Sequence, residues 1–188
     1  MDFTYHYTKE QERFREEVRT WLDANVPEDM KDPIDHRDFT DEHYWFWRET
    51  HKKLADKGWL YPTYPPEYGG GGLSAEAETI IEEEFHRARV ARGYFQPVFV
   101  LPGLLVWGTE EQKQRFLTPI LKGDKICWYK FTQPEGGADL ANYRTTAIRD
   151  GDDWILNGTN AFISGATGPA RPDWLYGPAM TDPDAPRH

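Results

Sequence analysis

One short segment of the sequence combines residue types that could hold a phosphorylated ligand. In Lys130–Leu140, which reads KFTQPEGGADL, two adjacent glycines follow a proline and a glutamate. Glycine lets backbone amides approach a phosphate group closely, and such amides can hold an anion without any positive charge. The segment lacks the glycine spacing of a dinucleotide fingerprint and the lysine of a P-loop, so a plain turn is the alternative interpretation.

Aromatic and hydroxyl residues occur on both sides of this segment. They are Tyr129, Phe131 and Thr132 before it, and Phe162, Ile163 and Ser164 further along the chain. Aromatic faces and hydroxyl donors beside a phosphate-accepting loop are what a planar heteroaromatic cofactor with a diphosphate tail requires. The competing interpretation packs the two phenylalanines into a core and leaves the hydroxyls in water. Both interpretations stay open at the level of the residues.

The part of the chain before this region carries the signals of a helical bundle. Thr8 and Thr109 each begin a capping box, and Ser74 precedes a stripe of apolar residues at helical spacing. Another such stripe runs from Tyr44 to Ala55. The apolar segment Val98–Trp107 is too short for a bilayer span, which needs ~20 apolar residues, and it predicts a buried helix.

Two segments of the helical part have a less obvious meaning. The prolines and four glycines of Tyr61–Gly72 are incompatible with a helix or a regular strand, so we predict an ordered aromatic loop. The adjacent glutamates Glu82–Glu84 could suggest acid–base chemistry. Neighbouring helix positions point in different directions, however, so a mostly solvated face is the better prediction.

After Lys125 the periodicity changes to two. Ile126–Thr132 alternates between two sets of side chains, which predicts a strand. Further strands are predicted at Tyr143–Arg149, Trp154–Leu156, Ala161–Ser164 and Trp174–Thr181, with turns at Asp150–Asp153 and Asn157–Gly158. The order predicts an antiparallel meander with unpaired edges. The expected fold class is therefore α+β, with an all-helical bundle at 1–124 and a truncated antiparallel β domain at 125–188.

Composition excludes several classes of function. The 32 acidic and 22 basic residues give a net charge of −10, which repels nucleic-acid phosphates. We expect no membrane span and no secretory signal, and the single cysteine, Cys127, cannot form an internal disulfide, so a cytoplasmic location is predicted. The six histidines show no metal-binding spacing, so no metal site is predicted.

Several motifs occur in a fixed order across nearly the whole chain. They are Pro65–Gly70, Trp107–Lys113, Phe131–Asp139, Thr145–Ala147, Gly151, Asn157–Gly158 and Phe162–Ser164. This succession resembles the acyl-CoA dehydrogenases. The resemblance implies a helical domain, a middle β domain and a C-terminal four-helix domain, with FAD between the last two. Members of that family remove the α and β hydrogens of an acyl-CoA thioester, and an electron-transferring flavoprotein usually reoxidises the flavin.

The resemblance also implies roles for the aromatic and hydroxyl residues. Tyr129, Phe131 and Thr132 would lie along the isoalloxazine ring, and Thr132 would form a hydrogen bond with its polar edge. Phe162 would cover a face of the ring. The Ser164 hydroxyl would lie near flavin N5, where charge develops on reduction. Ile163 lies between these last two residues in the same motif.

In the glycine loop, the resemblance implies contacts with the FAD diphosphate or the mouth of the CoA channel. Gly136, Gly137 and Ala138 are the residues concerned. Three positions depart from the family pattern: Gln133 replaces the usual glutamate, Ala138 the usual serine, and Asn160 a frequent lysine. Losing one hydroxyl donor at Ala138 would weaken FAD binding by ~1 kcal/mol.

No residue of this chain is predicted to be the catalytic base, because the resemblance implies that the C-terminal helices supply it. We expect the chain to stop before those helices. It would then be the N-terminal and middle portion of an acyl-CoA dehydrogenase, inactive alone and part of a homo- or hetero-oligomer. The alternatives are a non-catalytic partner subunit that completes a flavin site with another polypeptide, and a related flavin oxidase or monooxygenase.

Overall fold

The computed structural model describes residues 6–31, 38–90, 99–137, 139–163, 171–182 and 184–185. The helices of this part are α1 (Lys9–Asn25), α2 (Asp41–Asp56), α3 (Ala75–Arg87), α4 (Val100–Trp107), α5 (Glu110–Gln112) and α6 (Thr118–Leu121). The strands are β1 (Cys127–Tyr129), β2 (Thr146–Asp150), β3 (Asp153–Asn157) and β4 (Trp174–Tyr176). Helices precede strands, as the α+β prediction requires, while the domain limits 1–124 and 125–188 stay a prediction.

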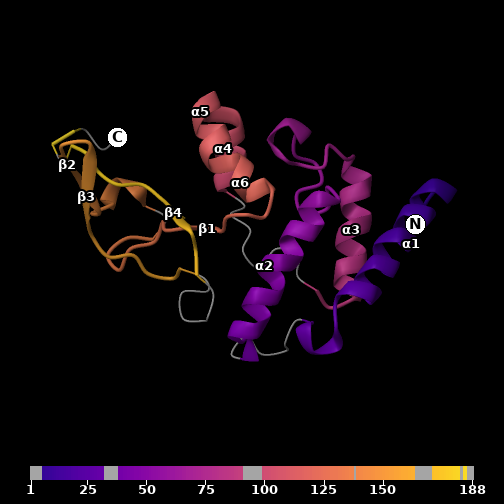
Figure 1. Cartoon of the computed structure of the whole chain (residues 1–188). Coiled ribbons are helices and arrows are strands. Elements are labelled where there is room, and N and C mark those ends of the chain that lie inside the picture. Colours follow the sequence, from indigo (N-terminus) through magenta and orange to yellow (C-terminus); the bar gives the residue numbers. More distant parts are fainter. Residues whose placement is uncertain are drawn as a thin grey trace, which may run out of the picture.

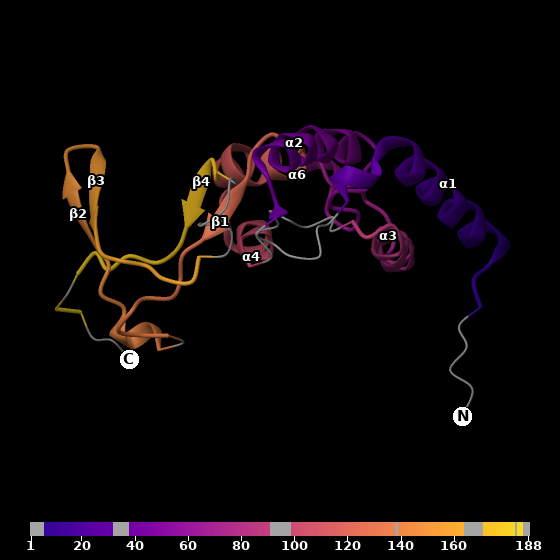
Figure 2. The same ribbon diagram turned by 90° about the horizontal axis from the view of Figure 1, so that it is seen from below.

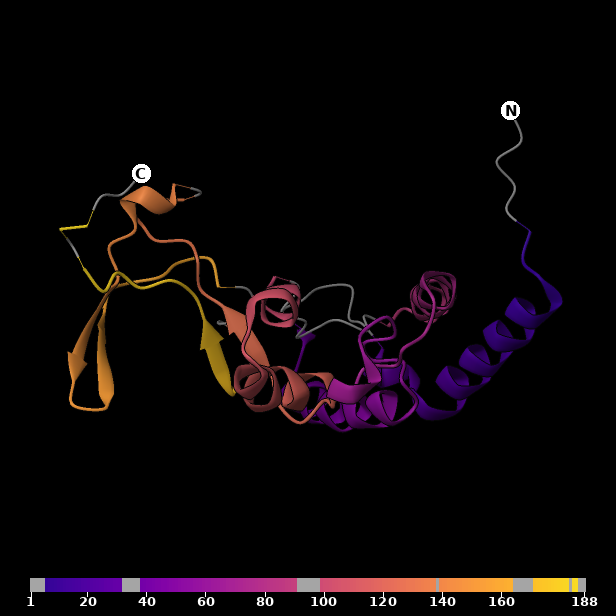
Figure 3. The same ribbon diagram turned by 90° about the horizontal axis from the view of Figure 1, so that it is seen from above.

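The elements form an elongated arc. Figure 1 shows α4, α5 and α6 between the strands and helices α1 and α3. In Figures 2 and 3, α1 lies at one end of the arc and the β2–β3 hairpin projects at the other. The helical and strand-containing parts therefore meet along α4, α5 and α6, next to β1 and β4.

Local capping explains where the helices begin. At α1, the Thr8 hydroxyl accepts a hydrogen bond from Gln11 N at 3.2 Å, and the Gln11 side chain accepts one from Thr8 N at 2.8 Å. A second capping box begins α5 at Thr109, so both predicted capping boxes are confirmed. A third, which was not predicted, lies at Thr40, where the His43 imidazole takes the place of the usual glutamine or glutamate.

The core of the helical part is built from one face of each long helix. Val18, Leu22, Trp47, Leu54, Ile81 and Phe85 are all buried. The Trp47 indole nitrogen also donates to Met30 O at 3.1 Å, so this large side chain is both packed and hydrogen-bonded. The predicted stripes on α2 and α3 are thus on the faces that the structure buries, and α1 buries a similar face through Val18 and Leu22.

Helix α4 corrects one expectation. The apolar segment does form a helix, but only Val100 and Leu101 are buried, whereas Val106 and Trp107 are 65% and 86% exposed. The prediction of a buried helix was wrong for the C-terminal end, because Leu104 and Leu105 contact the core only with partly buried side chains and Val106 and Trp107 are exposed. The composition of the segment shows that it is apolar, but it does not show which other elements pack against it.

The glutamate triplet corrects another expectation. The side chain of Glu84 is only 2% exposed and forms ion pairs with Arg15, Arg19 and Arg87. Glu83 also bonds Arg15 and the Tyr7 hydroxyl but stays half-exposed. The solvated-face prediction was therefore wrong for Glu84, because arginines from α1 approach α3 at this position.

Burial of His51 makes folding sensitive to pH. Burial and, to a smaller extent, the positive charge of Arg48 together lower the pKa of this α2 histidine to about 4. The unfolded chain, with a histidine pKa of ~6.5, binds the proton more readily, so stability should fall as the pH drops from ~6.5 towards 4. We expect the urea midpoint to decrease between a pH of about 7 and about 5, and His51→Gln to reduce that decrease. An equal pH dependence in both proteins would contradict this assignment.

The strand pairing differs from the predicted meander. β1 pairs with β4 in parallel, with Cys127 opposite Trp174 and Tyr129 opposite Tyr176. The antiparallel prediction was wrong here because alternation identifies a strand but carries no information on its partner or direction. Parallel strands need a long crossover, which the chain between β1 and β4 provides.

The β2–β3 hairpin is antiparallel as predicted, and its turn lies at Gly151, where φ is +61°. The strand predicted at Ala161–Ser164 is absent from 161–163, and Ser164 lies outside the described residues. Phe162 has a φ of +55°, which interrupts an extended backbone. The hairpin turn predicted at Asn157–Gly158 was therefore wrong: Asn157 is the last residue of β3, and irregular chain follows from Gly158.

Candidate functional site

The strand β1 presents an aromatic face. The ring centroids of Tyr129 and Phe131 are 5.9 Å apart, and Phe131 lies 6.1 Å from Tyr176 on β4. Phe99, at the start of α4, contacts Tyr129 edge-on at 5.5 Å. The alternation along β1 and the parallel register with β4 together place these side chains on one face. Tyr176 and Phe99 were not predicted, because nothing in their local sequence links them to β1.

The second predicted segment lies beside the first. Thr132 O accepts hydrogen bonds from Ala161 N at 2.9 Å and from the Asn160 side-chain amide at 3.2 Å. The same amide bonds the Tyr143 hydroxyl at 2.9 Å. Asn160, one of the departures from the family pattern, is thus a structural link that holds the two segments together.

The aromatic ring of Phe162, which follows this link, is exposed. Phe162 is 91% exposed and adopts a left-handed backbone conformation, which is unusual for a bulky residue. Ile163 is partly buried. The interpretation that packs both phenylalanines into a core is therefore wrong for Phe162, whose exposed ring makes no core contacts in a strained conformation. It holds only in part for Phe131, which is partly buried.

The glycine loop is a hydrogen-bonded turn. Gln133 N donates to Gly136 O at 3.0 Å, and Gly136 N donates to Gln133 O at 3.2 Å. Gln133 is buried, and its side-chain oxygen accepts from Arg144 N at 2.6 Å while its nitrogen bonds the Thr145 hydroxyl. The amide of Gly136 is therefore used inside the turn. Gly137 is exposed with open space around it, and Ala138 lies outside the described residues.

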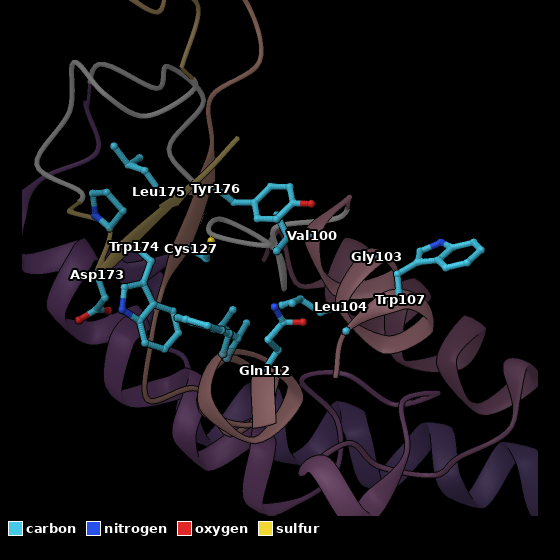
Figure 4. A pocket seen from close by; sticks show the side chains of 14 residues that line it. Val100, Gly103, Leu104, Trp107, Gln112, Cys127, Asp173, Trp174, Leu175 and Tyr176 are labelled. Carbon is cyan, nitrogen blue, oxygen red and sulfur yellow. The ribbon is translucent and has the colours of Figure 1, made fainter. Parts of the chain in front are cut away.

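A cavity of about 790 Å³ separates the aromatic strands from the helices. Its lining is mainly apolar and comes from α4, the α5–α6 segment, β1 and β4, as Figure 4 shows for Leu104, Trp107, Cys127 and Trp174. Phe116 packs edge-on against Trp174 at 5.5 Å and closes one side. The size falls within the range of small-molecule sites, ~300–1,000 Å³.

Asp173 fixes the position of the β4 wall. Its carboxylate accepts hydrogen bonds from Arg48 at 3.0 Å, Lys125 at 3.1 Å and Ile126 N at 2.8 Å. Burial alone would raise the pKa of this carboxyl group, but the hydrogen bonds from Ile126, Arg48 and Lys125 outweigh it and lower the pKa. Among the described residues that line the cavity, Asp173 is the one carboxylate, and it stays ionised in this network rather than acting as a base.

Cys127 contributes apolar surface to the cavity rather than a nucleophile. The thiol is buried in β1, and burial raises its pKa to about 11. A thiol with this pKa is almost entirely protonated at neutral pH and has little nucleophilic thiolate. The cavity therefore offers binding surface, and its described residues contain no group set up for covalent or acid–base chemistry.

Comparison with known proteins identifies the fold family. The family model described as "Acyl-CoA dehydrogenase, N-terminal domain" matches residues 8–124. The chain belongs to the acyl-CoA dehydrogenase family. The match covers the described helices α1 to α6, which carry the helical half of the cavity.

Relatives of this family member extend the match into the strands. The acyl-CoA dehydrogenase FadE29 of Mycobacterium tuberculosis is 34% identical over 181 residues, which cover 96% of this chain and 45% of the relative. The solved structure of the Tcur3481-Tcur3483 steroid ACAD superposes with a TM-score of 0.78 and 34% identity, over 100% of this chain and 47% of the other. The chain thus spans about half the length of the relatives that it matches.

Two further solved structures also match this chain. The ChsE4-ChsE5 complex of Mycobacterium tuberculosis matches with a TM-score of 0.73 and 31% identity, over 96% of this chain and 44% of the other. An acyl-CoA dehydrogenase complexed with FAD, from Bacillus anthracis, matches with a TM-score of 0.63 and 25% identity, over 84% and 26%. In the described part of this family member, no helix is long and apolar enough to cross a membrane, and no group of three or more possible metal ligands occurs.

Proposed function

We propose that this chain forms the N-terminal and middle portion of an FAD-dependent acyl-CoA dehydrogenase. The reaction would be α,β-dehydrogenation of an acyl-CoA thioester, with an electron-transferring flavoprotein as acceptor. The observation that carries the proposal is the aromatic face of β1 and β4 next to an apolar cavity, which Tyr176 of that face also lines. Together they offer one surface for a planar cofactor and an adjoining space for an acyl group.

The described residues fit a flavin. Tyr129 and Phe131 supply an aromatic surface and Phe162 presents an exposed ring. The Thr132 hydroxyl would supply a hydrogen-bond donor to the polar edge of the flavin. When bound, FAD would supply the hydride acceptor of the reaction. The open space at Gly137 would admit part of the diphosphate or CoA, whereas the Gly136 amide would first have to leave its turn. The proposed roles of Ile163, Ala138 and Ser164 rest on the family pattern.

The chain's own contribution is to bind and orient the reactants. The cavity walls would exclude water from the acyl group, and Asp173 would hold β4 against the helices through Arg48 and Lys125. We propose that the proton acceptor comes from outside this chain, so the isolated chain should not dehydrogenate acyl-CoA. A missing general base alone accounts for a loss of ~10²–10⁴-fold in rate.

Flavin binding provides the test of this proposal. We expect the purified chain to quench FAD fluorescence saturably, and Phe162→Ala to weaken FAD affinity by about tenfold because the exposed ring would otherwise stack on the flavin. Trp45→Ala is the matched control, since Trp45 is also an exposed aromatic residue but lies on α2. Equal FAD affinity in all three proteins would contradict the role of Phe162, and no binding by any of them would contradict the flavin site.

The β2–β3 hairpin favours a second candidate, in which a partner polypeptide completes the β domain. Ile148 and Ile155 face each other across the hairpin, as do Ala147 and Leu156 on its other face. Ile148, Ile155 and Leu156 are each about half-exposed, so both faces carry uncovered apolar surface. In sedimentation experiments, a monomeric, folded chain without flavin or partner would rule out this candidate.

A further inference from the structure

The orientation of the Gln112 side chain is fixed by the helix that it begins. Its Oε1 accepts a hydrogen bond from Thr109 N at 2.9 Å, while Gln112 N donates to the Thr109 hydroxyl at 3.2 Å. Rotating the amide by half a turn would place two N–H groups against each other. The capping box therefore decides which end of the amide is oxygen, a choice that geometry at the amide alone would leave ambiguous.

The other end of this amide lines the cavity. Figure 4 shows Gln112 reaching from its helix towards the space that Leu104 and Tyr176 border. Within the described part of the chain, its Nε2 donates no hydrogen bond to a protein group. The side chain is exposed, so water can satisfy these donors when the cavity contains solvent.

The apolar surroundings of this amide allow its N–H groups to discriminate between ligands. Phe116 and Ile120, at successive four-residue steps from Gln112, also line the cavity, and Trp174 faces them from β4. An acyl group that displaces water from these walls would leave the amide donors without acceptors unless it carries one itself. Leaving a buried donor unsatisfied costs ~1–3 kcal/mol, so such a site discriminates against a ligand that lacks the acceptor.

We propose that Gln112 selects acyl groups that carry a hydrogen-bond-accepting oxygen, such as a ketone, at a distance from the thioester. The inference rests on the proposed function, because it assigns the cavity to the acyl part of the substrate. Gln112 is then a specificity-determining residue that binds the distal end of the substrate. It takes no part in the chemical step.

The experiment compares matched CoA thioesters in isothermal titration calorimetry with the full chain. The probes are decanoyl-CoA and oxodecanoyl-CoA isomers with the ketone at the fifth, seventh or ninth carbon. We expect one ketone isomer to bind the unmodified chain about threefold to tenfold more tightly than decanoyl-CoA, the ratio that one net hydrogen bond gives. Gln112→Glu should abolish that preference, because the glutamate keeps the capping acceptor but has no N–H to donate.

Gln11→Glu is the matched control. Gln11 occupies the same capping-box position at α1 and accepts from Thr8 N at 2.8 Å, but it does not line the cavity. Both variants should have similar thermal stability, and Gln11→Glu should keep the ketone preference. If Gln112→Glu fails to fold, Gln112→Met keeps the side-chain length without the donor and serves the same comparison.

The outcomes separate the two proposals. Equal binding of all thioesters to the unmodified chain, or a ketone preference that survives in Gln112→Glu, would overturn the role of Gln112 and leave the acyl cavity in place. Failure of every thioester to bind would instead overturn the acyl cavity, and with it the proposed function of this face.

Discussion

Replacing Glu84 with glutamine is expected to lower the free energy of unfolding by about 3 kcal/mol. Arg19 donates to both carboxylate oxygens at 2.9 and 3.0 Å, Arg87 donates at 2.6 Å and Arg15 at 3.2 Å. The substitution would leave three arginines facing a neutral amide whose N–H groups point at their donors. Urea unfolding followed by circular dichroism measures the change directly.

The neighbouring Glu83→Gln is the matched control. Glu83 also bonds Arg15, at 2.6 Å, but its side chain is 45% exposed, so we expect a loss of only ~0–1 kcal/mol. Similar losses for the two variants would show that burial adds nothing to the Glu84 cluster. In that case, the cluster would behave as an ordinary set of surface ion pairs.

The Glu84 cluster also predicts a pH dependence distinct from that of His51. Burial alone would raise the pKa of Glu84, but the hydrogen bonds from Arg19, Arg87 and Arg15 outweigh it and lower the pKa to about 2. Its contribution to stability is therefore complete above the unfolded pKa of ~4.3 and is lost as the pH falls towards 2. Glu84→Gln should be less sensitive to pH in this range, whereas the window for His51 lies above it.

These residues show which parts of the fold the sequence can predict. The Thr8 and Thr109 capping boxes were predictable because every group involved lies within three positions of the others. The burial of Glu84 was not, because two of its three arginines come from α1. A local pattern reports charge and helical spacing but does not say which other helix packs against that face.

Some features of the candidate site were likewise predictable from the sequence and others were not. Alternation before the glycine loop predicted that Tyr129 and Phe131 share one face, and their ring centroids are 5.9 Å apart. The hydrogen bond from Ala161 N to Thr132 O brings the segment before Phe162 next to Thr132, while the role of Phe162 stays a prediction. The cavity could not be predicted, since its walls come from α4 and β4, which are far apart in sequence. The donor of Gln112 was hidden for a different reason: the capping box already explained why a glutamine stands there.

Replacing Gly71 with alanine is expected to lower the free energy of unfolding by about 3 kcal/mol, as severe overpacking does. A β-carbon at this position would overlap the carbonyl oxygen of Gly58 and lie 2.8 Å from Pro62 O. Both obstacles are backbone atoms, so no side-chain rotation relieves them. The Gly71 amide also donates to Tyr61 O at 3.0 Å, which ties the loop in place. Thermal and urea unfolding measure the loss.

Gly103→Ala makes the same chemical change where no atom lies within 4 Å of the added carbon. Gly103 lies within α4, so alanine should instead raise the free energy of unfolding by ~0.5–1 kcal/mol. The Gly71 loop also supports the cavity, because the Tyr68 hydroxyl donates to Glu110 at 2.8 Å, two residues before Gln112. Gly71→Ala should therefore weaken thioester binding as well as folding. Unchanged stability of Gly71→Ala would mean that the loop yields to the added carbon, and that the position of Gln112 does not depend on the loop.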